Sequence, residues 1–250
     1  MIQIKNNEQL AMMLKAGRIT GEAILKARDH IREGISTKEL DTIIHDYIVK
    51  CGAKPSFLGY GGFPGSACIS INEEVIHGIP KKDRILREGD IVKIDVGACY
   101  RGYHGDSANT FGVGKISDEA QALIAATRES FYRGVAFAKN GNRLGDVGFA
   151  ICDYATSCGY GVVREYVGHG VGRDLHEDPE VPNFGTANRG QRLYTGMTIA
   201  IEPMINMGTQ NVKVLGDNWT VITADHSLSA HYEHTVAITD GEPVLMTKVE

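Results

Sequence analysis

Apolar residues recur with a helical period in two segments near the start of the chain. A helix is predicted over residues 8–30, because Asn6 and Gln9 have the spacing of an N-terminal cap. A second helix is predicted after Ser36 and Glu39, which form a capping-box pattern. Its apolar residues fall on one helical face: Leu40, Ile43, Ile44, Tyr47 and Ile48.

The pattern changes to a period of two at residues 91–97, which predicts a β-strand. This stretch places Asp95 where a half-buried strand would normally carry an apolar side chain. Gly97 and the Arg101-Gly102 pair allow a turn, so residues 107–111 can return antiparallel. The sequence therefore predicts a β-hairpin that carries Asp95.

A second carboxylate, Asp106, follows eleven residues after Asp95. Two carboxylates on neighbouring strands repel each other unless a positive charge lies between them. One interpretation is a pair of aspartates at a solvated strand end, and the other is a pair of metal ligands. The hairpin alone leaves both interpretations open.

The second half of the chain repeats the plan of the first half. When the sequence is shifted by 107 residues, matching residues coincide: Glu22 with Glu129, Gly34 with Gly141, Cys51-Gly52 with Cys158-Gly159, and Ile94 with Ile201. We expect a single domain, residues 1–250, with two related halves at about 1–115 and 116–250. The predicted fold class is α+β, with a strongly curved antiparallel sheet and helices outside.

The duplication would bring acidic residues of both halves to one central site. In the 107-residue register Asp95 coincides with Glu202, and Pro203 keeps Glu202 in an extended conformation. Glu233 then relates to Glu202 as Asp106 relates to Asp95. The two halves together therefore predict a cluster of four carboxylates.

The second hairpin is longer than the first. Its returning strand is predicted at residues 231–238, so the connection has about twenty additional residues, roughly 206–228. This segment contains Trp219, which is the only tryptophan of the chain and would on its own be interpreted as a core anchor.

Composition narrows the class of protein without identifying it. Hydrophobic content of 42% and charged content of 23% are ordinary for a globular protein. The net charge of −5 provides no basic field for nucleic acid or an anionic membrane, so we expect no sequence-specific nucleic-acid binding and no membrane association. The five cysteines are odd in number and form no CxxC motif, which argues against a disulfide framework and favours a cytoplasmic location.

His169 is a further candidate ligand, because glycines on both sides leave its imidazole unobstructed. A histidine between glycines is more often a turn residue, but the predicted carboxylates change that balance. Two divalent cations would neutralise four carboxylates beside one imidazole. Oxygen-rich ligation without thiolate favours manganese, iron(II) or cobalt(II) over a structural zinc site.

Several motifs together carry a family resemblance. They are Ile94-Asp95-Val96, His104-Gly105-Asp106, Gly168-His169-Gly170-Val171-Gly172, Ile201-Glu202-Pro203 and Tyr232-Glu233-His234-Thr235. This set, from about residue 3 to residue 245, resembles the type I methionine aminopeptidases, and His77-Gly78-Ile79-Pro80 is similar to their short bacterial form. The resemblance implies the pita-bread fold and the metal ligands Asp95, Asp106, His169, Glu202 and Glu233.

The resemblance also implies a function and an expected set of roles. The enzyme would remove the initiator methionine from nascent polypeptides when the second residue is small, through attack of a metal-activated water on the first peptide bond. Glu202 would carry a proton to the leaving amine, His176 would steady the tetrahedral intermediate, and His77 would hydrogen-bond the substrate. Without the resemblance, these two histidines would be interpreted as loop imidazoles. A monomer with transient ribosome association is expected.

The resemblance implies a substrate pocket as well. Tyr60, Phe63, Cys68 and Trp219 stand at positions that line the methionine pocket in that family, and sulfur against aromatic rings suits such a pocket. Alone, Cys68 would be interpreted as a small core residue. The chain departs from the family pattern at three positions, which affects the expected pocket shape rather than the ligand set: Phe57, Leu175 and His231.

Three other functions compete with this prediction. A proline-specific peptidase of the same fold is the nearest, although such enzymes usually carry an additional amino-terminal domain. An inactive pita-bread module that only binds partners should have lost metal ligands, and this chain has all five. A structural metal site would be closed, with no reason for an aromatic pocket beside it.

Overall fold

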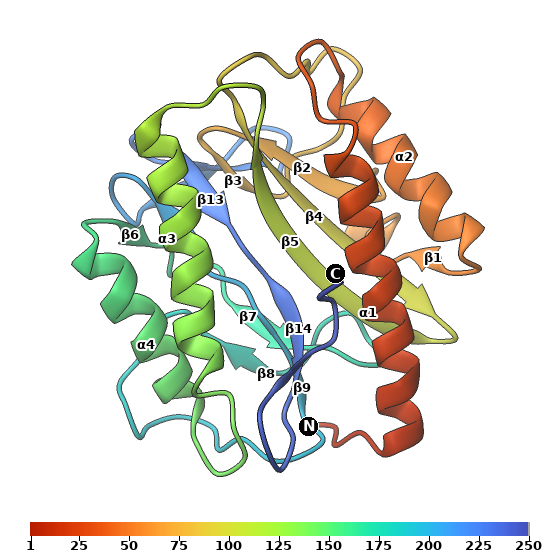
Figure 1. The fold of residues 1–250 in the computed structure, drawn as a ribbon, viewed down its shortest axis with the longest axis vertical. Coiled ribbons are helices and arrows are strands. Elements are labelled where there is room, and N and C mark those ends of the chain that lie inside the picture. Colours follow the sequence, from red (N-terminus) through yellow and green to blue (C-terminus); the bar gives the residue numbers. More distant parts are fainter. Residues whose placement is uncertain (250) are drawn as a thin grey trace.

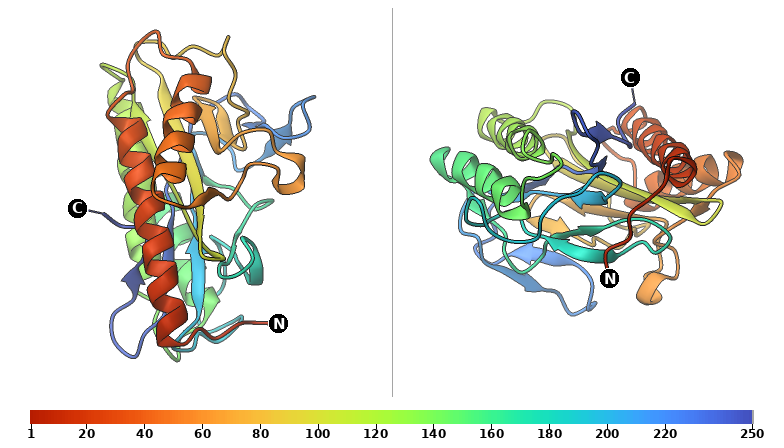
Figure 2. Two further views of the ribbon diagram at one scale, coloured as in Figure 1. Left: turned by 90° about the vertical axis from the view of Figure 1, so that its right-hand side faces the viewer. Right: turned by 90° about the horizontal axis from the view of Figure 1, so that it is seen from below.

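The computed structural model describes residues 1–249 as helices packed on one face of several curved sheets (Figure 1). Views from the side and from below show the helices together on one face and the strands behind them (Figure 2). The helices are α1 (Asn7–Arg28), α2 (Thr37–Lys50), α3 (Asp118–Val135) and α4 (Leu144–Ser157), with a short 3₁₀ turn η1 (Tyr60–Gly62). The expected α+β class is confirmed.

Both predicted N-terminal helix caps are present. The side chain of Asn6 accepts a hydrogen bond from the Gln9 N–H, and that of Ser36 accepts one from the Glu39 N–H. Each pair forms a complete capping box, which satisfies backbone donors that the first helical turn leaves free. Helix α1 ends at Arg28, two residues before the predicted end.

Within residues 1–249 the strands form four sheets. The first, in the order β1-β4-β2 with β5 paired to β4, comprises β1 (Lys54–Pro55), β2 (Ala67–Ile71), β4 (Ile91–Tyr100) and β5 (Tyr103–Gly112). The second, in the order β15-β14-β9-β7-β8, comprises β7 (Gly168–Gly170), β8 (Glu177–Val181), β9 (Thr198–Ile201), β14 (His234–Ala237) and β15 (Val244–Leu245). The other two comprise β6 (Gly161–Val162), β10 (Met204–Asn206) and β13 (Ser229–His231), and β3 (Glu74–Ile76), β11 (Val212–Val214) and β12 (Val221–Thr223).

The predicted hairpin is β4–β5, and its turn lies at Arg101 and Gly102, which both have positive φ. The prediction that Gly97 contributes to the turn is wrong. Gly97 lies inside β4 opposite Asp106, and a Cβ there would come within 2.7 Å of the Phe57 ring. Glycine is needed at this position for close packing rather than for chain reversal.

The prediction of one continuous strand over residues 231–238 is also wrong. Strand β13 ends at His231 and β14 begins at His234, while β9 ends at Ile201 and β10 begins at Met204. Strands β9 and β14 pair in one sheet, and β10 and β13 pair in another. The chain therefore passes from sheet to sheet at two neighbouring breaks, one of which contains Pro203, a residue without a backbone donor.

The 107-residue register recurs in the backbone. When the bounds of α2 are shifted by 107 residues, they coincide with the bounds of α4. In the first half the Gly34 N–H donates to the Leu86 carbonyl at 2.9 Å, and in the second half the Gly141 N–H donates to the Leu193 carbonyl at 2.9 Å. Each helix pair covers a cluster of buried apolar residues contributed mainly by its own half.

The additional segment of the second half forms a hairpin of its own. Strands β11 and β12 pair with each other, and β12 pairs with β3 from the first half. Trp219 precedes β12, so the hairpin delivers it beside His77, which follows β3. In residues 1–249, none of the helices combines the length and apolar character that crossing a membrane would require.

Candidate metal centre

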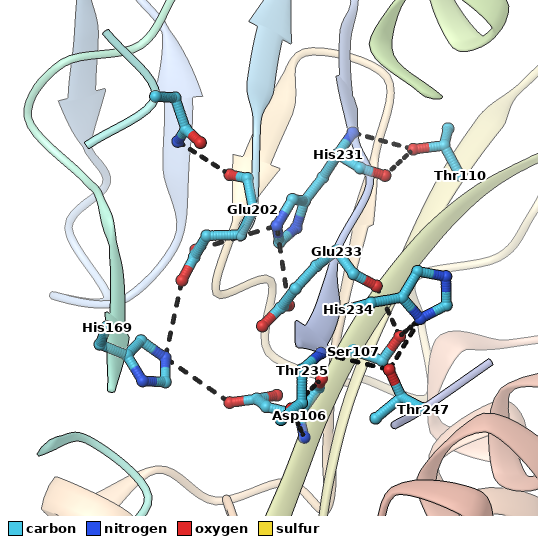
Figure 3. A network of polar contacts seen from close by, with 11 residues as sticks. Asp106, Ser107, Thr110, His169, Glu202, His231, Glu233, His234, Thr235 and Thr247 are labelled. Carbon is cyan, nitrogen blue, oxygen red and sulfur yellow. Dashed lines mark hydrogen bonds and ion pairs between the residues drawn. The ribbon is translucent and has the colours of Figure 1, made fainter. Parts of the chain in front are cut away.

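Acidic and imidazole side chains from both halves meet where β5, β7 and β14 approach one another (Figure 3). One donor atom each from Asp106, His169 and Glu233 lies within 4.8 Å of the others. Glu202 joins them, because its Oε1 is 3.6 Å from His169 Nε2, which in turn is 3.7 Å from Asp106 Oδ2. The structure therefore brings these predicted ligands to one place.

Hydrogen bonds between β5 and residues 233–235 fix the backbone of two of the acidic residues. The Asp106 N–H donates to Thr235 Oγ1 at 2.9 Å, and that hydroxyl donates back to the Asp106 carbonyl at 2.9 Å. The Glu233 N–H donates to the Ala108 carbonyl at 2.9 Å, and the Ser107 hydroxyl donates to the Glu233 carbonyl at 2.6 Å. The backbone of each acidic residue is thus fixed by the opposite half of the chain.

Asp95 reaches the cluster from β4, where it pairs with Ala108 of β5. Asp95 and Asp106 are diagonal rather than direct neighbours, since Asp106 pairs with Gly97. Glu202 follows the end of β9, and its carbonyl accepts a hydrogen bond from the Asn183 amide at 3.0 Å.

His169 presents a defined nitrogen to the carboxylates. Its Nδ1 lies 2.8 Å from the Gly170 carbonyl, which can only accept, so Nδ1 carries the proton and Nε2 has a free lone pair. The flanking glycines are required by packing, because a Cβ at Gly168 would come within 2.3 Å of the Ala200 carbonyl oxygen. A lone pair facing carboxylate oxygens at under 4 Å is favourable only with a proton or a cation between them.

Burial shifts the protonation of the cluster. It raises the pKa of Asp106 to about 7, and it raises the pKa of Asp95, Glu202 and Glu233 well above the ordinary range, with neighbouring carboxylates adding to the effect. Burial also lowers the pKa of His169 to about 3, so this imidazole is neutral at pH 7. Such a site favours the binding of positive charge.

The donor set suits divalent metal ions. Among residues 1–249, three buried carboxylate oxygens have no hydrogen-bond partner: Asp95 Oδ1, Asp106 Oδ1 and Glu233 Oε1. A buried carboxylate without a partner is costly, and coordination to a cation removes that cost. Four carboxylates and one neutral imidazole are oxygen-rich ligands that suit manganese, iron(II) or cobalt(II).

His231 also belongs to this cluster. The sequence did not predict its place there. Its Nε2 lies 3.9 Å from Glu202 Oε2 and 3.9 Å from Glu233 Oε2. The side chain is fully buried, and neither ring nitrogen has a hydrogen-bond partner in the described part of the chain. In the sequence, only its position two residues before Glu233 could have signalled this placement.

The cluster forms one wall of a cavity of about 240 Å³. Every predicted metal ligand lines this cavity, and so does every predicted substrate-binding residue: Phe57, Tyr60, Phe63, Cys68, His77, Leu175, His176 and Trp219. Four of them, Phe57, Phe63, Cys68 and Leu175, are buried against one another, with Trp219 packed beside them. The cavity is therefore acidic at one wall and apolar and aromatic at another.

Two further histidines, His176 and His77, line the cavity beside aromatic groups. The His176 ring lies 4.0 Å from the His169 ring, and its Nδ1 is 2.8 Å from the Tyr60 hydroxyl. His77 packs edge-on against Tyr166 at 5.7 Å and against Trp219 at 6.4 Å. Tyr166 lines the cavity and was missed from the sequence, although it stands only three residues before His169.

Comparison with known proteins shows similarity over the whole chain. A family model described as metallopeptidase family M24 matches residues 11–240. The methionine aminopeptidase of Clostridium acetobutylicum is 54% identical over 250 residues, covering 100% of both chains. A crystal structure of methionine aminopeptidase from Thermotoga maritima has a TM-score of 0.98 and 44% identity, covering 100% of both chains. A prolidase from Pyrococcus furiosus has a TM-score of 0.80 and 26% identity, covering 99% of this chain and 66% of that one.

Proposed function

The chain belongs to metallopeptidase family M24, and from this premise we propose that it is a methionine aminopeptidase. It removes the N-terminal methionine of a polypeptide by hydrolysis of the first peptide bond. The resemblance seen in the sequence, including the pita-bread fold, is confirmed. The reaction is metal-dependent, in keeping with the description of the family as metallopeptidases.

One observation carries the choice of substrate: the carboxylate–imidazole cluster shares a cavity with an apolar, sulfur-tolerant pocket. Methionine is unbranched, and its thioether interacts favourably with the edges of aromatic rings. Phe63 and Trp219 supply such rings, and their centroids lie 5.1 Å apart. Burial raises the pKa of Cys68 well above its ordinary value, so its thiol stays neutral and acts as a small apolar contact.

We propose that Asp106, His169, Glu202 and Glu233 would hold one divalent ion, and that Asp95 would hold a second together with Asp106 and Glu233. The unpartnered oxygens of Asp95, Asp106 and Glu233 support this assignment. Manganese, iron(II) and cobalt(II) are the candidates, because the ligands are mostly oxygen. When bound, such ions lower the pKa of a coordinated water and polarise the scissile carbonyl.

Glu202 is proposed to carry the proton of the reaction. Its two carboxylate oxygens face different imidazoles, with Oε1 toward His169 and Oε2 toward His231. Burial raises its pKa, which favours a carboxyl group that can accept a proton and then release it to the departing amine near neutral pH.

His176 and His77 are proposed to hydrogen-bond the substrate. Burial raises the pKa of Tyr60 and lowers that of His176, so both groups are neutral at pH 7, and we propose that the Tyr60 hydroxyl is the donor to His176 Nδ1 in their 2.8 Å contact. The remaining proton of His176 is then on Nε2, where it can stabilise the oxyanion that develops at the attacked carbonyl. His77, also neutral, has one N–H for the backbone of the substrate.

We further propose that residues 1–250 form one catalytic domain made of two related halves. The recurring 107-residue register of helices and hydrogen bonds supports this. The substrates are the N-termini of nascent polypeptides with a small second residue. Transient ribosome association follows from that substrate class, and a monomeric state and a cytoplasmic location are also part of the proposal.

Three tripeptides test the function. The protein is stripped of metal, reloaded in parallel with manganese, iron(II) or cobalt(II), and offered Met-Ala-Ser, Met-Leu-Ser and Ala-Pro-Ala. We expect release of methionine from Met-Ala-Ser alone, because Met-Leu-Ser has a bulky second residue. Cleavage of only Ala-Pro-Ala would instead identify a proline-specific peptidase and overturn the proposal.

A further inference from the structure

A buried ion pair lies outside the metal cluster and joins distant parts of the chain. Lys5 Nζ is 2.6 Å from Glu177 Oε2, and the two side chains are 5% and 7% exposed. Lys139 and Glu242 form a pair with the same separation, but their side chains are 38% and 79% exposed. A buried charge that loses its partner is strongly unfavourable, whereas an exposed pair contributes little.

Lys5 is held in place by the segment around it. Its backbone N–H donates to the Gly196 carbonyl at 2.8 Å, and its ammonium also donates to the Gln3 carbonyl at 3.2 Å. A Cβ on Gly196 would come within 2.8 Å of both Ile4 and Lys5, so this N-terminal arm lies directly on the turn before β9. The Met1 ammonium makes a further contact with Asp178 of β8.

Glu177 uses its second carboxylate oxygen to close a loop. Oε1 accepts hydrogen bonds from the Arg173 N–H at 2.7 Å and from the Asp174 N–H at 3.3 Å. A Cβ on Gly172 would lie 2.3 Å from this oxygen, so the carboxylate fits directly against the loop backbone. Residues 172–177 therefore form a loop that the Glu177 carboxylate closes by accepting these two backbone hydrogen bonds.

This loop carries two groups of the cavity. Leu175 is buried in the apolar wall, and the His176 ring lies 4.0 Å from the His169 ring at a tilt of 50°, while its Nδ1 meets the Tyr60 hydroxyl. The side chain of Glu177 does not line the cavity. Its carboxylate instead connects the loop to the N-terminal arm through Lys5.

We propose that Lys5 and Glu177 are positioning residues for His176. The ammonium compensates the buried carboxylate, and the carboxylate fixes the loop so that the His176 imidazole faces the reacting carbonyl. The role of His176 rests on the proposed function; the connection from Lys5 to the loop does not. The N-terminal arm is then part of the catalytic apparatus although it is remote from the substrate.

The test is a double-mutant cycle with the metal-loaded enzyme and Met-Ala-Ser as substrate. In Lys5→Met we expect kcat to fall about 10- to 100-fold, as for a catalytic group displaced by about 1 Å, with KM changed little. Lys5→Arg should recover most of kcat. Lys139→Met, which removes the ammonium of the exposed Lys139–Glu242 pair, is the matched control and should have the kcat of wild type. In a His176→Ala background, Lys5→Met should cause no further loss.

If Lys5→Met lowers kcat by the same factor in the wild-type and His176→Ala backgrounds, the proposal is overturned. A wild-type kcat in Lys5→Met would also overturn it. If Lys5→Met does not fold, Lys5→Met/Glu177→Gln removes both charges and replaces it in the cycle. Hydrogen exchange provides a readout independent of the reaction: the Arg173 and Asp174 amides should exchange at least tenfold faster in Lys5→Met. Unchanged exchange would contradict the proposal even if the peptide assay had identified another substrate.

Discussion

Glu202 shows how one side chain acquires its properties from groups far apart in the chain. Its oxygens lie 3.6 Å from His169 Nε2 and 3.9 Å from His231 Nε2, and its side chain is 12% exposed. Burial and the nearby Asp106 and Asp95 carboxylates raise its pKa. A carboxyl group in this environment is suited to proton transfer near neutral pH.

We expect Glu202→Gln to lower kcat about 100- to 10,000-fold, the usual contribution of general acid–base catalysis, because an amide cannot accept and release the proton. The substitution preserves size, so the circular dichroism spectrum should match that of wild type. Kinetics with Met-Ala-Ser are measured at verified metal content. A rate near wild type would remove Glu202 from the proton-transfer step.

His77 should make the stability of the protein depend on pH. Burial lowers its pKa from 6.5 to about 4, with a smaller contribution from His176. Between these pH values the unfolded chain binds a proton that the folded protein does not, so stability falls as the pH decreases from 6.5 to 4. The lowered pKa of His77 corresponds to a change of at most about 3 kcal/mol in the unfolding free energy.

We expect the unfolding free energy of His77→Gln to decline less between pH 6.5 and 4.5 than that of wild type. Urea unfolding of the metal-free proteins at several pH values measures the difference. His30→Gln, at an exposed histidine, is the control and should follow the wild-type profile. Parallel pH profiles for wild type and His77→Gln would contradict the prediction.

At the scale of elements, the β4–β5 hairpin depends on close contact with α1. A Cβ on Gly105 would come within 2.6 Å of the Gly17 backbone, and the Thr20 hydroxyl donates to the Gly105 carbonyl at 3.0 Å. Helix and strand touch here without side chains between them. The glycines therefore set the distance between the helix layer and the strand that carries Asp106.

We expect Gly105→Ala to destabilise the protein by about 1–3 kcal/mol, because the new methyl group must push α1 away from β5. Gly216→Ala is the matched control: within residues 1–249 its Cβ would meet no atom closer than 4 Å, so its effect should stay within about 0.5 kcal/mol. Urea unfolding measures both variants. Equal stability of the two variants would show that the close contact between Gly105 and the Gly17 backbone does not contribute to stability.

The two hairpins also show where a sequence pattern fails at the scale of elements. The caps at Asn6 and Ser36 and the turn at Arg101-Gly102 depend on neighbours within a few residues, so the sequence predicts them. The breaks after Ile201 and His231 depend on which sheet each half-strand joins. Alternating apolar residues continue through a break, and the pattern therefore suggests one strand.

At the scale of the whole molecule, the candidate metal centre links the two halves. Asp106 of β5 and Glu233 beside β14 bring negative charge from both halves into a buried space. Ionising these buried carboxyl groups together is unfavourable in the metal-free protein, which is why their pKa values are raised, and bound cations offset this cost. Metal binding should therefore stabilise the whole fold.

We expect added manganese(II) or cobalt(II) to raise the Tm of the metal-free protein, since a free ion at 100 times its Kd stabilises by about 2.7 kcal/mol. Thermal unfolding with increasing metal, together with a binding titration, measures the effect and the number of ions. Asp106→Asn should lose most of the shift. Saturation at one ion per chain would contradict the second site.

His231 and the Lys5–Glu177 pair show what could not be predicted. His231 was noted in the sequence only as a departure in the pocket, yet its ring lies between Glu202 and Glu233. Lys5 and Glu177 are 172 residues apart, and no local pattern connects them. Such contacts depend on how β8, β9 and the N-terminal arm pack together.

The sequence by itself determined the first two helices with their caps, the first hairpin and, through the 107-residue register and the family motifs, the set of acidic residues around His169. These features depend on local periodicity or on residues repeated in order along the chain. Only the tertiary structure decided which atoms face one another: the orientation of His169 Nε2, the place of His231 and the connection of the His176 loop to Lys5. Distances of a few ångströms between distant segments arise from packing, which no single segment encodes.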